Sequence, residues 1–480
     1  MPASGSTSTA AQIAVTPSIV TAVELPTGFD LLDLHRLAPE RYPFLLESPG
    51  GTTAQAHFDI LFAFPGETLR LDENWKLSGD HAGQFTEFLT ALDSWWASES
   101  AERQHESLTG SSAAAKSSLP FQGGWFIFLA YELVRETEPT ISSAALPGFP
   151  VALAVRIPVA LIRCRQSGHT WLLAEPGQEP AVAQISADID TATRTRQQSS
   201  DRTANFTDCI AEPDPQEFLA AVERARELIT AGDVFQVNLA RRWTGRLHAG
   251  IDAWQIYHRL REVNPAPFSG FAKFGACAIV SSSPERLVRA SNGYIETRPI
   301  AGTRPRASTA APEEGWRQAL LSNAKERAEH VMLIDLERND LGRVCVPGTI
   351  AVNELMTVES YAHVHHIVSN IRGELRADVT PGMLIRAVFP GGTITGCPKV
   401  RCMEIIHDLE AQPRGPYTGA MGYLNLDGSC DFNILIRTIQ VCGKEFSLSA
   451  GSGIVADSIA ERELEETRAK AKGMLLALQS

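Results

Sequence analysis

The chain has 480 residues, enough for about three average domains or one large composite domain. Hydrophobic residues make up 44% of it and charged residues 21%, as in an ordinary soluble globular protein. The formal net charge of −13 argues against a nucleic acid or an anionic membrane as partner, because such surfaces bind a basic face. An anionic ligand would therefore need locally gathered Arg and Lys side chains.

Cysteine usage and the N-terminal sequence indicate the compartment. The eight cysteines show no CxxC pair and no zinc-ligand spacing, so we expect free thiols in a reducing cytosol. The first 20 residues lack the charged and apolar regions of a signal peptide. No run of 18 apolar residues occurs, so no membrane span is expected. These features predict a soluble, cytoplasmic protein.

Composition divides the chain into four segments. Residues 1–20 form a Ser/Thr/Ala-rich flexible tail, and residues 21–173 hold strand-like runs such as HFDILFAFP and GGWFIFLAYEL. Residues 174–213 are polar and poor in aromatic side chains, which is typical of a linker. Residues 214–480 form the better patterned part of the chain.

The C-terminal segment mixes helices and strands. An amphipathic helix is predicted from the Asp-Pro step at residue 214 to a stop at Gly232, followed by the strand VFQVNLARR. Further elements are a helix near 313–335, strands at 422–428 and 433–441, and a terminal helix from about residue 459. No regular βαβ rhythm is present, so an α+β fold is favoured.

Two pairs of glutamates stand out. Glu326 and Glu329 lie three residues apart on one predicted helix, and Glu463 and Glu466 do so on another. If the helices converge, the four carboxylates repel one another and require a cation, and oxygen ligands alone suit Mg²⁺. The alternative is that these side chains cover solvated helix faces.

Other stretches allow two interpretations each. AGSGIVADS (450–458) is either a cradle of backbone amides for a carboxylate or a tight hairpin turn. FPGGTITGCPKVRCMEII (389–406) places a Gly-rich turn before a helix that either faces an anion or ends a loop. YAHVHHIVS holds either a proton-donating histidine or packed ones. Arg437, in an otherwise apolar predicted strand, requires an anionic partner.

Together these stretches resemble one family. The ordered series SSSPERLV, TRPIAGTRPR, KERAEHVMLIDLERNDLGRV, FPGGTITGCPKVRCMEII, GAMGYL, IRTI, GSGIVADS and EETRAK resembles the chorismate-utilising enzymes, which include anthranilate, aminodeoxychorismate, isochorismate and salicylate synthases. The resemblance is strong over about 205–480 and weaker before it. It implies that residues 214–480 are a chorismate-binding catalytic domain, and that the fold has two large, mostly antiparallel sheets packed face to face with helices outside.

The resemblance also implies roles for particular residues. Glu329 and Glu466 would bind Mg²⁺, supported by Glu326 and Glu463. Glu285 matches the acid/base glutamate, His366 matches the catalytic histidine, and Thr303 would line the chorismate cavity. The expected chorismate-binding residues are Thr393, Tyr423, Arg437, Gly451, Ser452, Gly453 and Lys470.

The nucleophile is expected to be ammonia. Water-using members carry a lysine base at the position of Gln236, and a neutral amide cannot serve as that base. The ammonia would come from a separate glutamine amidotransferase subunit, because the chain shows no Cys-His-Glu glutaminase segment.

The position of amination depends on conflicting motifs. NPAPFSGF, SPER, FPGGTITG and LPFQGGW resemble the large subunit of aminodeoxychorismate synthase, which aminates ring carbon C4. Ala301 stands where many such enzymes carry a nucleophilic lysine, and PIAGT is the form found in anthranilate synthases, which aminate C2. We weigh the flanking motifs above this residue and expect aminodeoxychorismate synthase, with anthranilate synthase as the alternative.

A regulatory pocket is the last expectation. Leu46, Glu47 and Ser48, together with Pro267, Phe268 and Ser269, resemble the tryptophan pocket of both relatives. A non-catalytic subunit that only binds chorismate or tryptophan is the rival interpretation. The two intact glutamate pairs argue against it, because a pure binder does not need them.

Overall fold

The computed structural model describes residues 19–26, 28–49, 57–107, 119–196, 205–305, 324–360 and 364–479. Within these ranges, side chains are described except at residues 19, 102–107, 196, 301–305, 324–326, 360 and 364–366. The predicted tail therefore lies mostly outside the described residues.

The first sheet runs in the order β1-β9-β8-β3-β2-β12-β13-β22-β23-β11-β10, and β19 pairs with β11. Neighbouring strands are antiparallel. Its strands are β1 (Ile19–Val23), β2 (Phe44–Glu47), β3 (Phe58–Ala63), β8 (Val159–Cys164), β9 (Thr170–Ala174), β10 (Ile210–Ala211), β11 (Gln236–Arg246), β12 (Phe268–Phe274), β13 (Cys277–Ser283), β19 (Gly396–Cys397), β22 (Thr438–Cys442) and β23 (Glu445–Ile454).

The second sheet runs in the order β16-β18-β15-β14-β21-β20-β6-β7-β4-β5, and β17 pairs with β18. It is also antiparallel. Its strands are β4 (Thr68–Leu71), β5 (Leu77–Gly79), β6 (Gly124–Leu129), β7 (Ala152–Ile157), β14 (Arg286–Ser291), β15 (Tyr294–Thr297), β16 (Ile300–Pro305), β17 (Ala351–Ser360), β18 (Val364–Glu374), β20 (Ala420–Asn425) and β21 (Cys430–Ile434).

The two sheets face each other across an aromatic core. Phe44 and Phe62 of the first sheet pack against Phe126 of the second, and the rings of Phe44 and Phe126 stack with centroids 4.0 Å apart. Burying such side chains removes about 25 cal/mol of apolar hydration cost per Å². The expected α+β sandwich is therefore confirmed.

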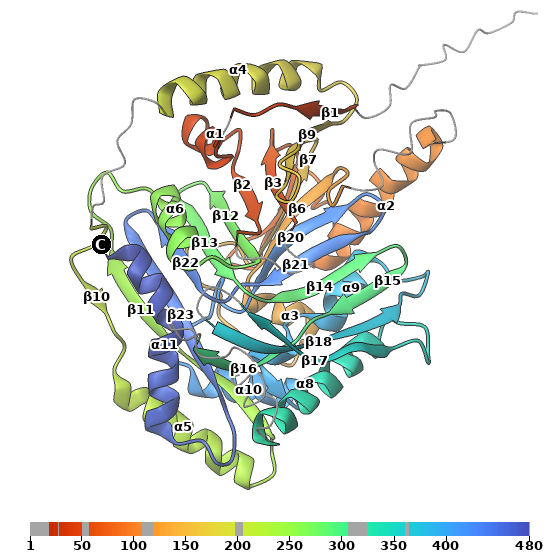
Figure 1. The fold of residues 1–480 in the computed structure, drawn as a ribbon. Helices are drawn as coiled ribbons and strands as arrows, with labels where there is room; N and C mark the ends of the chain where they lie inside the picture. Colours follow the sequence, from red (N-terminus) through yellow and green to blue (C-terminus); the bar gives the residue numbers. More distant parts are fainter. Residues whose placement is uncertain are drawn as a thin grey trace, which may run out of the picture.

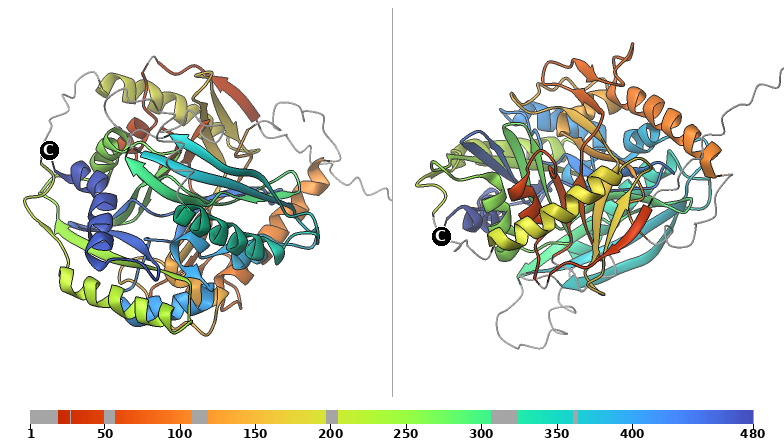
Figure 2. Two further views of the ribbon diagram at one scale, coloured as in Figure 1. Left: turned by 60° about the horizontal axis from the view of Figure 1, so that its bottom comes forward. Right: turned by 90° about the horizontal axis from the view of Figure 1, so that it is seen from above.

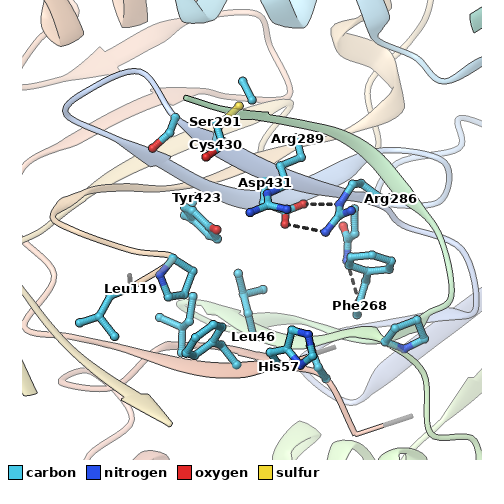
Figure 3. A pocket seen from close by; sticks show the side chains of 18 of the residues that line it. Leu46, His57, Leu119, Phe268, Arg286, Arg289, Ser291, Tyr423, Cys430 and Asp431 are labelled. Carbon is cyan, nitrogen blue, oxygen red and sulfur yellow. Dashed lines mark hydrogen bonds and ion pairs between the residues drawn. The ribbon is translucent and has the colours of Figure 1, made fainter. Parts of the chain in front are cut away.

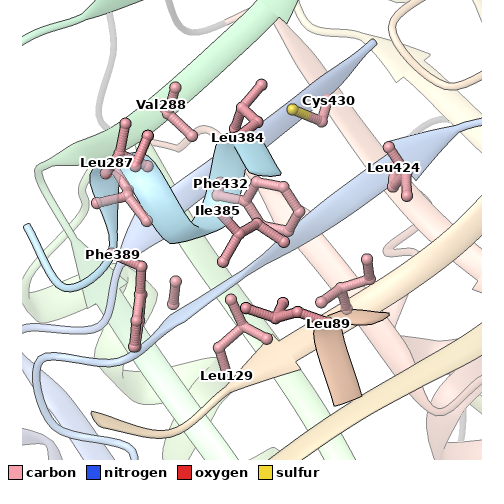
Figure 4. Close-up of a cluster of buried hydrophobic side chains, with 14 of the residues drawn as sticks. Leu89, Leu129, Leu287, Val288, Leu384, Ile385, Phe389, Leu424, Cys430 and Phe432 are labelled. Carbon is pink, nitrogen blue, oxygen red and sulfur yellow. The ribbon is translucent and has the colours of Figure 1, made fainter. Parts of the chain in front are cut away.

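Helices cover the outer faces of the sandwich (Figures 1 and 2). The first sheet is covered by α1 (Leu32–Leu37), α4 (Glu179–Arg196), α6 (Ala253–Val263) and α11 (Ala460–Leu478). The second is covered by α2 (Phe88–Ser107), α8 (Ala324–Gly342) and α9 (Pro381–Val388). Figure 4 shows Leu384 and Ile385 of α9 among Leu129, Leu424 and Phe432 of that sheet. Helices α5 (Pro215–Thr230) and α10 (Lys399–Leu409) pack beside β11. The short elements are α3 (Val134–Thr137), η2 (Tyr131–Leu133) and η3 (Gly392–Ile394).

The predicted linker 174–213 contains a regular helix, α4. One face of α4 is buried against the core of the first sheet. Its buried residues follow the spacing of a single helical face: Ala181, Ile185, Ile189 and Ala192. The remaining residues of α4 are mostly polar, so composition alone concealed an amphipathic element. Each sheet joins one block of strands from the N-terminal part to one block from the C-terminal part, and the blocks meet where β2 pairs with β12 and where β6 pairs with β20.

The prediction of free thiols at all eight cysteines is wrong for one pair. Cys277 on β13 and Cys442 on β22 are directly opposed in the antiparallel register, and a disulfide joins them. Their separation of 165 residues hid this pairing from sequence inspection. The other cysteines, all within the described ranges, carry free thiols. In the described part of the chain, no helix combines the length and apolar composition needed to cross a membrane.

Candidate active site

A cavity of about 140 Å³ lies where strands of both sheets, η3 and α11 meet. Five residues singled out in the sequence line it: Glu285, Thr393, Arg437, Gly451 and Lys470. Its remaining lining residues are Asn238, Pro284, Ile300, Ile394, Tyr417, Ile436, Ser449, Ala450 and Met474. One acid and two cations thus share a small cavity, in the combination expected for a site that binds an anion and moves a proton.

Glu285 lies between β13 and β14, where the chain passes from the first sheet to the second. Its side chain is buried, and this burial raises its pKa to about 7, although the positive charges of Lys470 and Arg437 act in the opposite direction. Thr393 lies close by, but the threonine Oγ1 and the carboxyl Oε1 both lack a hydrogen bond of acceptable geometry among the described residues. Glu285 is therefore poised to hold or release a proton near neutral pH.

Arg437 does not lie in a strand, contrary to the sequence prediction. The run NILIRTIQV is interrupted at 435–437, because β21 belongs to the second sheet and β22 to the first. Arg437 is half-buried at this crossing and adopts a left-handed backbone conformation with φ of 51°. Non-glycine residues rarely adopt this conformation. The crossing places the guanidinium group at the cavity.

The stretch 450–454 belongs to strand β23, so the tight-turn interpretation is wrong for 450–454, and Ser449, Ala450 and Gly451 of this strand line the cavity. A Cβ atom added to Gly451 would lie 2.6 Å from Asn238 Oδ1 and 2.7 Å from the Tyr417 hydroxyl. A Cβ atom on Gly453 would lie 2.3 Å from Gln236 Nε2. At Gly451 the backbone oxygen of Leu239 would also lie 2.8 Å from the added Cβ atom and cannot withdraw, so this position favours glycine, whereas at Gly453 the three nearest atoms belong to the flexible Gln236 side chain.

Helix α11 lies along β23. Lys470 Nζ lies 2.7 Å from Glu466 Oε1 and donates to the carbonyl oxygen of Gly451 over 2.9 Å. The hydroxyl of Ser452 donates to Glu463. These contacts bring the second predicted glutamate pair and the predicted cradle together on one face.

The first glutamate pair lies on α8. Glu329 is half-buried, whereas the side chain of Glu326 lies outside those described. Among the described side chains, no group of three His, Cys, Asp or Glu is arranged to hold a metal ion. The four residues offer carboxylate oxygens only, the ligands that Mg²⁺ prefers, so the donor set fits this ion chemically. Their convergence on one ion stays a prediction.

Three further predicted residues lie on the strands at the edge of the second sheet. In the register of β16 and β18, Thr303 is opposite His366 and Ala301 is opposite Ile367. The side chains of Ala301, Thr303 and His366 lie outside those described. Ile300, the first residue of β16, lines the cavity.

Tyr423 lies away from the chorismate-site candidates. It lies on β20, which pairs with β6, and it lines a separate cavity of about 290 Å³ together with residues of the N-terminal strands (Figure 3). The placement of Tyr423 with the other expected chorismate-binding residues is therefore not observed.

The same separate cavity brings together all six residues of the predicted tryptophan pocket: Leu46, Glu47, Ser48, Pro267, Phe268 and Ser269. The pairing of β2 with β12, in which Glu47 is opposite Ser269, explains how segments 220 residues apart meet. Glu47 is buried and accepts a hydrogen bond of 2.7 Å from the Tyr257 hydroxyl, and Arg261 Nη1 lies 3.1 Å from its carboxylate. Arg286 forms two hydrogen bonds with Asp431 on the opposite wall (Figure 3).

Sequence reasoning missed Asn238 and Tyr417 as cavity residues. Asn238 lies two residues after Gln236 on the same polar face of β11, and this spacing could have indicated that both side chains point toward the site. Asn238 Oδ1 is buried without a hydrogen-bond partner among the described residues. Tyr417 precedes β20 in an irregular stretch, for which no pattern predicts a direction.

Comparison with known proteins places this geometry in a family. A family model described as chorismate binding enzyme matches residues 45–476. An anthranilate synthase component I-like protein of Synechocystis is 41% identical over 363 residues, covering 75% of this chain and 74% of that protein. Aminodeoxychorismate synthase component 1 of Bacillus subtilis is 40% identical over 404 residues, covering 82% of each.

Solved structures agree. Anthranilate synthase component I of Streptococcus pneumoniae superposes with a TM-score of 0.74 at 29% identity, covering 88% of this chain and 93% of that one. The menaquinone-specific isochorismate synthase of Escherichia coli, with a TM-score of 0.69 at 20% identity and coverage of 97% and 96%, shares the fold. The chain therefore belongs to the chorismate binding enzyme family and is a chorismate-utilising enzyme.

Proposed function

We propose that the protein is component I of aminodeoxychorismate synthase, which replaces the 4-hydroxyl group of chorismate with an amino group from ammonia. The observation that carries the proposal is a buried Glu285 with its pKa raised to about 7, in one cavity with Lys470 and Arg437. This arrangement offers an acid for a leaving hydroxyl group and cations for a dicarboxylate.

Substrate binding follows from the lining of the cavity. Arg437 and Lys470 offset the charge of the two carboxylates of chorismate. The backbone of Gly451 lies on the same wall, and Ser452 and Gly453 follow it on β23. Thr393 Oγ1 lies close to the Glu285 carboxyl group without a hydrogen bond of good geometry among the described residues, so it can donate to the substrate.

Proton transfer is assigned to Glu285. Its neutral form donates a proton to the 4-hydroxyl oxygen, the carbon–oxygen bond breaks and water leaves. Ammonia supplies the new carbon–nitrogen bond. Gln236 lies against Gly453 with a neutral amide that cannot activate water as a base, which supports ammonia over water as nucleophile.

Magnesium would be held by Glu329 and Glu466, with Glu326 and Glu463 supporting them. When bound, such an ion offsets negative charge on the substrate and at the departing hydroxyl group. The partnership of Lys470 with both Glu466 and Gly451 links this acidic face to the cavity wall.

Amination at C4 rests on sequence motifs. SPER, FPGGTITG, NPAPFSGF and LPFQGGW favour it, whereas Ala301 removes the lysine nucleophile of many C4-aminating relatives. Relatives of both kinds match at similar identity. Anthranilate synthase, the second candidate, is favoured by Ala301 alone.

We further propose that a separate amidotransferase subunit delivers the ammonia, and that the 290 Å³ cavity binds tryptophan. The component I relatives support the first proposal. The assembly of all six predicted residues supports the second. The predicted cytoplasmic location suits such a biosynthetic enzyme.

The direct test is turnover of chorismate by the purified chain with Mg²⁺ and excess ammonium. A non-aromatic product that yields 4-aminobenzoate only after a lyase is added supports the proposal. Fluorescent anthranilate with release of pyruvate by this chain alone would establish the second candidate. A lack of turnover, with chorismate or tryptophan bound, would favour a regulatory subunit.

A further inference from the structure

Helix α8 carries a second buried carboxyl group, Glu337, that the proposed reaction does not use. Glu337 is only 5% exposed, next to the buried Leu336 and three residues before the buried Asp340. Helix α8 itself packs against strands β16 and β18 of the second sheet (Figure 1). Among the side chains that the structure describes, no Arg, Lys or His forms an ion pair with it, because the nearby Lys399 pairs with Asp340. A buried carboxylate without a cation is costly, so the environment favours the neutral acid.

The hydrogen bonds of Thr297 point the same way. Its Oγ1 lies 3.0 Å from the carbonyl oxygen of Leu287 and 3.1 Å from Glu337 Oε2. A hydroxyl group has one proton to donate, and a backbone carbonyl can only accept. When the threonine donates to Leu287, the second hydrogen bond exists only if Glu337 carries a proton and donates it to Thr297.

Glu337 also contacts the segments that surround Glu285. Leu287, reached through Thr297, follows Glu285 by two residues on β14. Thr297 ends β15 just before Ile300, whose backbone hydrogen-bonds to the Glu285 carboxyl group. A Cβ atom on Gly392 would lie 3.1 Å from Glu337 Oε1 and 2.6 Å from Leu336 Cδ2, so η3, which carries Thr393, lies directly on this part of α8.

We propose that Glu337 is a positioning residue for the reaction, whose neutral carboxyl group holds together the three segments around Glu285 and shares its titration. The proposal rests on the acid role assigned to Glu285 above. It concerns the support of that acid and is independent of whether ammonia enters at C2 or C4.

Electrostatics supports the coupling. Burial raises the pKa of Glu337 to about 7, with the negative charges of Asp340 and Glu285 adding to the effect, and with Lys399 and a hydrogen bond donated by Thr297 to the charged form opposing it. Glu285 titrates in the same range and is faced by Lys470 and Arg437. Two carboxyl groups that repel when both are charged lose their protons as a pair, so ionisation of one keeps the other protonated to higher pH.

The first test needs no activity. Because the folded protein keeps Glu337 protonated above its usual pKa of 4.5, the unfolded state binds fewer protons between about pH 4.5 and 7, and wild-type stability falls as pH rises through this window. Glu337→Gln removes this contribution. We expect the melting temperature of the variant, relative to wild type, to rise between pH 5.5 and pH 8.

The control Asp335→Asn, at a 65% exposed side chain on the same helix, should show a melting-temperature difference from wild type that does not change with pH. A constant difference for Glu337→Gln as well would overturn the neutral-carboxyl assignment.

The second test measures chorismate consumption with saturating ammonium between pH 6 and 8. The ratio of variant to wild-type turnover cancels the ammonia–ammonium equilibrium at each pH. We expect the ratio for Glu337→Gln to fall by roughly threefold from pH 6 to pH 8, since Glu285 no longer has a coupled group that delays its ionisation. A ratio independent of pH would overturn the shared titration.

Two further variants separate the possible failures. Glu285→Gln should abolish consumption; if it does while the Glu337→Gln ratio stays flat, the inference fails and the acid role stands. If Glu285→Gln stays active, the proposed acid role itself fails. If Glu337→Gln does not fold, Glu337→Met fills a similar volume without a titrating group, and the pH dependence of its turnover ratio and of its melting temperature should be the same as expected for Glu337→Gln.

Discussion

Glu285 shows how a single residue obtains its chemistry from its surroundings. The motif SPER identified it by resemblance, but the motif contains no information about its burial. The structure adds that Lys470 and Arg437 share its cavity and that burial nevertheless dominates, which raises the pKa to about 7. No motif identified Asn238 and Tyr417. They become cavity residues only because β11 and the 417 loop lie against Gly451 of β23.

At this scale we expect Glu285→Gln to lower kcat by about 10²- to 10⁴-fold with little change in KM, because glutamine cannot donate the proton. The active form of the wild type is the neutral acid, so turnover corrected for free ammonia should decline as pH rises through about 7. Steady-state kinetics against pH checks both. Glu465→Gln, at an exposed position on α11, is the control. A Glu285→Gln enzyme of near wild-type kcat would contradict the assignment.

Gly451 gives a second prediction at residue scale. Its added Cβ would meet Asn238 Oδ1 at 2.6 Å and the backbone oxygen of Leu239 at 2.8 Å, and the backbone cannot withdraw as a flexible side chain can. Gly451→Ala should raise KM for chorismate by about tenfold or more, which corresponds to roughly 1.4 kcal/mol of binding. Gly342→Ala, where the nearest atom lies 4.0 Å away, should bind normally. Equal KM values for both variants would remove Gly451 from the site.

At the scale of elements, the interruption between β21 and β22 is the decisive feature. A continuous apolar run predicted one strand over 433–441, whereas the chain changes sheets at 435–437 and places Arg437 in a left-handed conformation. Local periodicity cannot reveal such a crossing, because both flanking strands are buried and equally apolar. Helix α5, in contrast, begins directly after its predicted Asp214 cap and ends at Thr230, two residues before the predicted stop at Gly232.

We expect Arg437→Lys to weaken chorismate binding without unfolding the protein. Lysine keeps the positive charge and fits at this half-buried position, but it cannot form two parallel hydrogen bonds to a carboxylate. KM should rise by about 10- to 100-fold, equivalent to roughly 1.4–2.7 kcal/mol. Thermal unfolding run beside the kinetics separates binding from stability. An unchanged KM would place the substrate carboxylates elsewhere.

At the scale of the whole molecule, both sheets are assembled from distant parts of the chain. The sequence predicted the α+β class and some of the strands, among them β3, β6 and β11, and the two-sheet sandwich followed from family resemblance. Strand order was not predictable, since β2 pairs with β12 and β6 with β20 across more than 200 residues. The same long-range pairing creates both cavities and the Cys277–Cys442 disulfide.

The assembly also predicts a dependence on metal. The glutamates proposed as ligands come from α8 and α11, two helices far apart in the sequence. Chelation with EDTA should reduce ammonium-dependent turnover to background, and excess Mg²⁺ should restore it. Glu466→Gln should raise the Mg²⁺ concentration needed for half-maximal rate. Full activity after exhaustive chelation would contradict the proposed role of the glutamate pairs.

The central claim is amination of chorismate at C4, and the position of the nitrogen in the product tests it most directly. The purified chain would be incubated with chorismate, Mg²⁺ and ¹⁵N-labelled ammonium, and the product examined by NMR. The account predicts a non-aromatic product with the label on C4 and the enolpyruvyl group retained. A label on C2 of an aromatic ring, with pyruvate released, would contradict it and make Ala301 the residue that decides the reaction.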